Sequence, residues 1–175
     1  MFNASITKKD LIMSIQPQWV YKIWNKTKTI EVRKTKSKYK PKFRIFIYCT
    51  RAGDKLHRLT LNSVVKGVSK RDDLNLNGKI VAHCTCPEIK EFKWDEINHC
   101  YDISSDDLQA TCLTQEQLYV YGKGKTLYGY VLSHVMPYPG GGVPITEAYN
   151  KTERGNKTLT TAPQSWGYVD GVGPI

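Results

Sequence analysis

The segment from Pro17 to Lys34 limits the possible folds of this chain most strongly, because a helical pattern passes there directly into a strand pattern. Pro17 suits the first turn of a helix, where its missing N–H is not needed. Apolar residues then recur at helical spacing: Trp19, Val20, Ile23 and Trp24. We therefore expect a helix that buries one face and ends near Asn25 and Lys26. Because a strand must follow within a few residues, the fold has to combine helices and strands.

The strand expected at residues 29–34 brings charged side chains together. Side chains alternate along a strand, so Glu31 and Arg33 share one face while the two β-branched residues occupy the other. Lys28 stands at the strand entrance. The two cations favour the ionised form of Glu31, and the group can present donors to a phosphate, a base edge or a polarised carbonyl. An ordinary ion pair on a half-solvated strand would give the same pattern.

The remaining elements are predicted from β-branched and aromatic runs and from helix-capping patterns. The expected further strands are Leu11–Ile15, Phe43–Cys49, Lys79–Cys86, Leu127–Tyr138 and Gly167–Val169. A helix should begin at Ser104 or Ser105, ahead of two acidic residues. Thr114 and Gln117 form a capping-box pattern for a second short helix that ends at Gly122. Together these patterns predict an α+β fold with a curved, barrel-like sheet of about five to six strands and short helices packed at its ends.

The length of 175 residues suits one domain with a real hydrophobic core. We expect residues 1–175 to form this single domain. Two stretches rich in polar residues, glycine or proline interrupt the strand pattern: a polar insertion at 51–77 and a long loop at 137–161.

The net charge of +10 is concentrated in the N-terminal part of the chain, since residues 1–70 carry a net +14 and residues 71–175 a net −4. Ten cations and a single acid lie between Lys22 and Arg44: Lys22, Lys26, Lys28, Arg33, Lys34, Lys36, Lys38, Lys40, Lys42 and Arg44, with Glu31. Such a patch attracts polyanions, foremost nucleic acid. A solvated lysine loop that protects a strand edge is the alternative.

The five cysteines, an odd number without a regular framework, indicate free thiols in a reducing compartment. Cys49 and Cys112 are expected in the core. The run His83-Cys84-Thr85-Cys86 contains zinc-type ligands, but one intervening residue is too few for the usual structural zinc spacing. We therefore expect core thiols, no metal site and no cofactor. The chain has no run of about eighteen apolar residues and no signal-peptide pattern at its start, so we expect a cytoplasmic protein without a membrane span.

Three motifs in order resemble the ASCH domain family, in particular its longer phage and Gram-positive members. Lys28, Glu31 and Arg33 fall on the family signature Gly-x-Lys-x-x-Glu-x-Arg, with Lys26 standing where the signature has glycine. The run 46–50 (Phe-Ile-Tyr-Cys-Thr) is similar to the family's central strand. The run 162–169 (Ala-Pro-Gln-Ser-Trp-Gly-Tyr-Val) is similar to its closing Pro-Pro-Gln-Ser-Trp-x-Tyr-Val motif, of which it matches only the second proline.

The resemblance implies a PUA-like β-barrel that holds RNA in a cleft beside the barrel. Some members of the family are enzymes, among them ribonucleases and an amidohydrolase that deacetylates a modified cytidine. In that amidohydrolase branch a threonine nucleophile occupies the position of Glu31, so its specific chemistry is not expected here.

As a binding module, the protein would use Lys28 and Arg33 to recognise phosphate or a base, with Glu31 orienting Arg33 or accepting from a base amino group. Tyr48, Gln164 and Trp166 are expected to line the same cleft, where aromatic faces stack bases and an amide reads a base edge. Trp166 packing in the core and Gln164 capping a loop is the alternative. The expected ligand is RNA or another single-stranded nucleic acid, with a small modified nucleoside as a further candidate.

As an enzyme, the protein would be a metal-independent hydrolase, a ribonuclease or an amidohydrolase acting on a modified nucleoside at the same cleft. Lys28 would stabilise developing negative charge, Glu31 would act as general base and Arg33 would orient a phosphate. A carboxylate whose ionised form is favoured by cations is a weak base at neutral pH, which counts against this alternative. The residues leave open whether the protein turns over a substrate. A third class, a protein-interaction module built on the loop at 137–142, has no chemical support, and a protein partner stays unknown.

Overall fold

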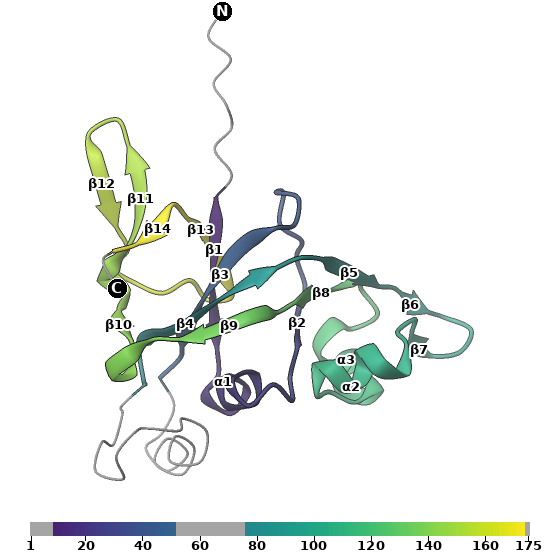
Figure 1. Ribbon diagram of the computed structural model, residues 1–175. Helices are drawn as coiled ribbons and strands as arrows, with labels where there is room; N and C mark the ends of the chain where they lie inside the picture. Colours follow the sequence, from purple (N-terminus) through teal and green to yellow (C-terminus); the bar gives the residue numbers. More distant parts are fainter. Residues whose placement is uncertain (1–8, 52–75, 174–175) are drawn as a thin grey trace, which may run out of the picture.

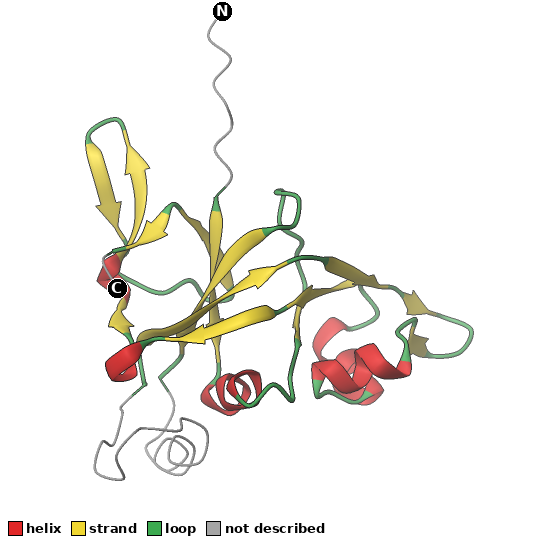
Figure 2. Cartoon of the chain, viewed as in Figure 1, coloured by secondary structure: helices red, strands yellow, loops and turns green. Residues whose placement is uncertain are grey.

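The computed structural model describes residues 9–51 and 76–173 (Figure 1). These residues form fourteen strands, three α-helices and two short 3-10 helices (Figure 2). The predicted α+β fold is therefore confirmed. The polar insertion expected at 51–77 lies outside the described residues except at its two ends.

The largest sheet has six strands, in the order β10-β4-β3-β1-β13, with β9 as a second partner of β4. Its members are β1 (Asp10–Ile15), β3 (Phe43–Cys49), β4 (Lys79–Cys86), β9 (Ser133–Pro137), β10 (Val143–Pro144) and β13 (Trp166–Val169). β1 and β3 run parallel, and the other pairs are antiparallel. The central strands are buried on both faces, which explains why they are nearly continuous apolar runs.

A second sheet, in the order β2-β8-β5, continues from the first. It consists of β2 (Ile30–Arg33), β5 (Ile89–Phe92) and β8 (Leu127–Val131). β4 leads into β5 past Pro87, and β8 leads into β9 past Leu132. These two segments pair with each other, so one long two-stranded antiparallel ribbon passes from the first sheet into the second. The strand predicted at 127–138 is therefore two strands. It bends because the β4–β9 register shifts next to His134, whose φ of 51° lies in the left-handed region.

The sheet is curved, but within the described residues its backbone pairing does not close into the expected barrel. Pairing runs from β13 through β1, β3, β4 and β9, and then over the bend through β8 to β2. β2 has no backbone partner on the side of β1 among the described strands. We call this place the β1–β2 junction. The charged side chains of Glu31 and Arg33, from β2, lie at this junction.

Three helices lie beside the two sheets: α1 (Pro17–Trp24), α2 (Ser105–Thr111) and α3 (Gln115–Gly122). α1 follows β1 directly and packs Val20, Ile23 and Trp24 into the main core. α2 begins after Ser104, whose hydroxyl caps it, and α3 begins with the predicted capping box at Thr114. Both lie next to the β2-β8-β5 sheet (Figure 1).

The long loop expected at 137–161 is mostly regular structure. After the 3-10 turn Pro139–Gly141, β10 pairs with β4, and a hairpin of β11 (Ala148–Thr152) and β12 (Gly155–Thr158) projects from the molecule (Figure 1). Gly142 is required there, since an added Cβ would lie 2.3 Å from the Ile80 carbonyl oxygen. The hairpin was missed because its strands are polar and exposed, without apolar alternation. Four further short strands also escaped prediction: β5, β6 (Trp94–Asp95), β7 (Cys100–Tyr101) and β14 (Gly171–Val172).

Three of the five cysteines are the expected core thiols, whereas Cys100 and Cys112 are half-buried. Cys49, Cys84 and Cys86 are fully buried, and burial raises the pKa of Cys49 and Cys84 to about 12. Cys112 is only half-buried, because it ends α2 in a left-handed conformation that turns its thiol toward the Thr27 carbonyl. None of the helices in the described ranges is long and apolar enough to span a membrane.

Candidate functional site

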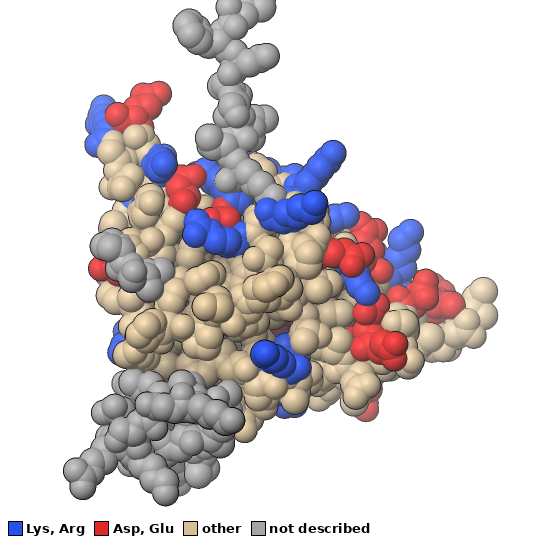
Figure 3. Space-filling model, in the orientation of Figure 1, with Lys and Arg blue, Asp and Glu red and all other residues tan. Residues whose placement is uncertain are grey.

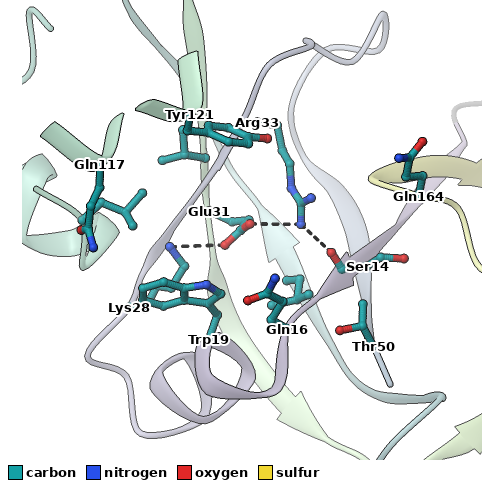
Figure 4. A pocket seen from close by; sticks show the side chains of 13 residues that line it. Ser14, Gln16, Trp19, Lys28, Glu31, Arg33, Thr50, Gln117, Tyr121 and Gln164 are labelled. Carbon is teal, nitrogen blue, oxygen red and sulfur yellow. Dashed lines mark hydrogen bonds and ion pairs between the residues drawn. The ribbon is translucent and has the colours of Figure 1, made fainter. Parts of the chain in front are cut away.

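A pocket of about 380 Å³ lies at the β1–β2 junction, between the end of β1, α1, β2 and α3 (Figure 4). Its floor is charged and buried, its walls include two aromatic side chains, and its rim carries three exposed glutamines. The lining residues are Ser14, Ile15, Gln16, Trp19, Lys28, Glu31, Val32, Arg33, Thr50, Leu113, Gln117, Tyr121 and Gln164.

Glu31 lies at the centre of the floor, between two cations. One carboxylate oxygen is 3.3 Å from Lys28 Nζ and the other is 3.0 Å from Arg33 Nη2. All three side chains are about nine-tenths buried or more. Their ion pairs hold Glu31 as an oriented carboxylate, and each of its oxygens keeps acceptor capacity for a ligand. The sequence-predicted grouping of these three side chains is therefore observed.

Lys28 is bonded entirely to the protein. Its ammonium group donates to the carbonyls of Ile30, at 2.9 Å, and Thr111, at 2.7 Å, and forms the third contact with Glu31. Thr111 is the last residue of α2, where the helix dipole favours a cation. Since an ammonium has three hydrogens, Lys28 ties α2 to β2 and keeps none for a ligand.

Arg33 bridges the β1–β2 junction. Its Nη2 donates to the Ser14 carbonyl of β1, at 2.9 Å, and its Nη1 donates to the Ser165 hydroxyl, at 3.2 Å. Side-chain bonds thus connect β2 to the end of β1 and to Ser165 before β13, where no pairing between the described strands joins β2 to them. Among the described residues the buried Arg33 Nε–H has no partner. Arg33, like Lys28, thus directs its observed bonds to the protein and helps to fix Glu31.

The aromatic walls come from Trp19 on α1 and Tyr121 on α3, both half-buried (Figure 4). The ammonium groups of Lys22 and Lys28 lie 4.9 and 5.2 Å from the Trp19 ring centroid. Burial raises the pKa of Tyr121, so its phenol stays protonated at neutral pH. A flat ligand between these walls would meet a ring face, the Glu31 carboxylate and the amides at the rim.

The pocket brings together four of the six predicted ligand-binding residues: Lys28, Glu31, Arg33 and Gln164. Tyr48 and Trp166 are not in its lining. Tyr48 packs in a separate part of the core with Ile12 and Phe46. Trp166 donates its indole N–H to the Thr35 hydroxyl, at 3.0 Å, and so is bonded to the loop after β2, outside the lining of this pocket.

Sequence reasoning missed the other side chains that shape the pocket: Gln16, Trp19, Thr50, Gln117 and Tyr121. Trp19 had been assigned to the buried helix face with its neighbours. Gln117 and Tyr121 are four residues apart on α3, so both lie on one helix face. That spacing was a usable signal, but only the position of α3 beside β2 gives it meaning.

The turn before β2 explains the glycine of the family signature. Lys26, at that position, has a φ of 64°, in the left-handed region that glycine adopts without cost. The turn therefore keeps the conformation that the signature implies although the side chain differs. It delivers Lys28 into the floor of the pocket.

Within residues 9–51 and 76–173, no three His, Cys, Asp or Glu side chains are grouped so that they could hold a metal ion. The site is therefore described by its ion pairs, aromatic walls and amides alone.

Comparison with solved structures identifies the fold. The chain is similar to the ASCH protein of Zymomonas mobilis, with 14% identity, a TM-score of 0.53, and coverage of 91% of this chain and 87% of that one. Two point mutants of that protein match similarly. One has 15% identity, a TM-score of 0.55, and coverage of 92% of this chain and 90% of that one. The other has 14% identity, a TM-score of 0.54, and coverage of 91% of this chain and 87% of that one. No protein-family model and no curated protein matches the sequence. Over more than nine-tenths of its length, the chain therefore has the fold of an ASCH domain.

Proposed function

We propose that this protein is an ASCH-type nucleic-acid-binding module that takes a base of RNA, or of a nucleotide fragment, into the pocket at the β1–β2 junction. ASCH domains generally bind nucleic acid, and the fold and the three signature residues support the same role here. The observation that carries the proposal is the Glu31 carboxylate, buried at the floor of a pocket with an aromatic wall.

The proposed contacts follow from the geometry of the pocket. Trp19 offers a face on which an unpaired base stacks. Glu31 accepts from a base amino or imino N–H, and Arg33 orients the Glu31 carboxylate through their ion pair. Gln164 at the rim reads a second base edge or contacts the sugar. Lys28 contributes by holding Glu31 in place, because its own hydrogens are occupied.

Hydrolysis at the same pocket is the second candidate, since a carboxylate flanked by cations can activate a nucleophile beside a phosphate. Two observations weigh against it. Both Glu31 oxygens are already in contact with cations, Lys28 and Arg33, and taking a proton from a nucleophile would weaken those contacts. Lys28 would have to give up a backbone carbonyl to stabilise charge that develops on a substrate.

The test is equilibrium binding of labelled, mixed-sequence single-stranded RNA in EDTA, with the RNA run afterwards on a denaturing gel. Trp19→Ala should weaken binding by roughly 5- to 100-fold, the loss of a stacking contact of about 1–3 kcal/mol. Glu31→Gln removes the charged acceptor with little change of shape and should also weaken binding. Glu153→Gln, on the exposed β11–β12 hairpin, is the matched control and should bind as wild type does.

Circular dichroism and thermal unfolding would show that each variant is folded. Folded Trp19→Ala and Glu31→Gln variants that bind RNA as wild type does would overturn the proposal. RNA cleaved by wild type and left intact by Glu31→Gln would establish the hydrolase instead.

A further inference from the structure

The loop that leaves β2 is held in a defined place, although it is rich in lysine. The Tyr130 hydroxyl accepts from the Ser37 N–H, at 2.8 Å, and the Tyr168 hydroxyl accepts from the Lys38 N–H, also at 2.8 Å. Together with the bond between Trp166 and Thr35, these contacts fix the loop at several points. We refer to residues 34–39 as the lysine loop.

Alternate residues of the lysine loop place an ammonium group over an aromatic ring. Lys34 Nζ lies 4.7 Å from the ring centroid of Tyr121, and Lys36 Nζ lies 5.9 Å from that of Tyr128. Lys38 Nζ lies 5.3 Å from the rings of both Tyr39 and Tyr168. The lysines are exposed and the rings are half-buried, so solvent reaches both partners of each pair.

The series of pairs begins at the pocket. Tyr121, under Lys34, is itself a wall of the pocket. Tyr128, under Lys36, lies opposite Arg33 in the β2–β8 register, so its side chain is next to the arginine of the pocket floor. The lysine–aromatic pairs therefore extend the pocket surface along the loop without an interruption in the chain.

The lysine loop carries positive charge, and one of its lysines is paired with an acidic side chain. Lys36 Nζ is 2.5 Å from a carboxylate oxygen of Glu91, which lies opposite Tyr128 in the β5–β8 register. Figure 3 shows Lys and Arg side chains gathered over the loop between β2 and β3, with acidic side chains beside them. Lys34 and Lys38 have no acidic partner among the described residues.

We propose that the ligand is a strand rather than a free nucleoside: single-stranded RNA that places one base in the pocket and runs its next nucleotides along the lysine loop. This inference rests on the proposed function. Exposed ammonium groups contact phosphates, and a lysine that leaves its ring to do so uncovers a ring face for an intervening base. The alternation of cation and aromatic ring is the arrangement that a single strand requires, since its own phosphates and bases alternate.

The test compares ligands of increasing length. Affinities are measured for the four nucleoside 5′-monophosphates and for mixed-sequence RNAs of about two, four and eight nucleotides. These lengths cover the number of nucleotides that one binding site of this kind typically holds. Binding should tighten with length. The plot of log affinity against log salt should become steeper by about 0.7 for each lysine that neutralises a phosphate.

Lys34→Ala and Lys38→Ala should each weaken the longest RNA more than the mononucleotide and reduce the salt slope by about 0.7. Lys157→Ala, an exposed lysine on β12, is the matched control and should change neither quantity. Glu91→Gln should have the opposite effect, tighter binding of the longest RNA, because it frees Lys36. A loop that only supports the fold would not produce a gain of affinity.

The outcomes separate the two proposals. Mononucleotides that bind with an affinity unchanged by added length would overturn the strand and leave the pocket proposal standing. Affinity that rises with length but responds to Lys34→Ala and Lys38→Ala no more than to Lys157→Ala would overturn this path for the strand. The absence of binding to every ligand would overturn the proposed function itself.

Discussion

The ion-paired group at the pocket floor assigns different duties to side chains that look alike in the sequence. Lys28 and Arg33 are both cations next to Glu31, yet Lys28 also donates to two backbone carbonyls, while Arg33 also donates to Ser14 and Ser165. The lysine thus joins α2 to β2, and the arginine joins β2 to the end of β1. A buried ion pair does not by itself stabilise a fold, but removing one partner leaves the other uncompensated.

Lys28→Ala should destabilise the protein strongly. It leaves the Ile30 and Thr111 carbonyls without their donor and removes one cation from Glu31, a change that typically costs about 3–5 kcal/mol. Urea unfolding of the two proteins would measure the loss. Lys125→Ala, at an exposed position, is the control and should stay within about 0.5 kcal/mol of wild type. Equal stabilities of the two variants would contradict the assigned role.

Lys26→Gly should stabilise the protein, against the usual direction of glycine substitutions. Lys26 is exposed and adopts a left-handed conformation that costs a non-glycine residue about 1–2 kcal/mol. The greater entropy of glycine in the unfolded chain offsets part of this, about 0.4–1 kcal/mol. Chemical denaturation should therefore show a gain of a few tenths to about 1 kcal/mol. Lys22→Gly, inside α1, is the contrast and should lose about 1 kcal/mol.

The lysine loop shows how an irregular element gains a single conformation from its neighbours. Three aromatic side chains from β8 and β13 bond to it, namely Tyr130, Trp166 and Tyr168. Trp166 belongs to the motif that closes the ASCH resemblance, and its observed contact is with this loop. The closing motif therefore serves the site indirectly, by placing the segment that follows the signature residues of β2.

Trp166→Phe and Thr35→Val each delete the same hydrogen bond, the first from the donor side and the second from the acceptor side. Each should destabilise the protein by about 0.5–1.5 kcal/mol. In the double variant the second substitution should add little, because the bond is already absent. A double-mutant cycle on urea unfolding measures this coupling. Fully additive effects would show that the bond contributes nothing to stability.

Local sequence patterns correctly predicted those helices and strands whose boundaries depend on a few neighbouring residues. The capping box at Thr114 and the end of α3 at Gly122 were located correctly, and so was β3 from its run of β-branched and aromatic residues. The bend at Leu132 was not predictable, because it depends on β8 and β9 having partners in different sheets. The β11–β12 hairpin was missed because its pairing leaves exposed, polar strands without apolar alternation.

The sequence predicted the grouping of charged side chains in the pocket, but not the aromatic walls that give the pocket its shape. Glu31 and Arg33 are two residues apart on one strand, so alternation alone puts them on one face. Trp19 and Tyr121 come from helices on opposite sides of β2, and no local pattern brings them together. Tyr48 and Trp166 were placed in the cleft by residue type, whereas the sheet register assigns one to the core and the other to the lysine loop.

The molecule as a whole buries several groups that must stay protonated, which predicts its response to alkali. Burial raises the pKa of Cys49, Cys84, Tyr130 and Tyr138 to about 12, from ordinary values of 9.0 for the thiols and 10.0 for the phenols. Between these values the folded state holds protons that the unfolded state has lost. Stability is therefore fully present below about pH 9 and falls as the pH rises toward 12.

The urea midpoint, measured at increasing pH, should decline across this window. Cys84→Ala removes one of the groups, so its midpoint should start lower, from the lost packing, and decline less steeply. A slope unchanged by the substitution would show that the thiol does not contribute to the alkaline loss of stability.

The β1–β2 junction has a consequence for how such a fold diversifies. Among the described residues, side chains connect β2 to the end of β1 here, chiefly Arg33 bonded to Ser14 and Ser165, without a ladder of backbone hydrogen bonds between the two strands. A backbone hydrogen-bond ladder depends little on which side chains its strands carry. The contacts of this junction, in contrast, are made by individual side chains, and mutation can exchange these one at a time. Evolution can therefore alter the chemistry of the pocket without breaking a strand pair. This junction is therefore a place in the described part of the sheet where a new specificity requires little rebuilding.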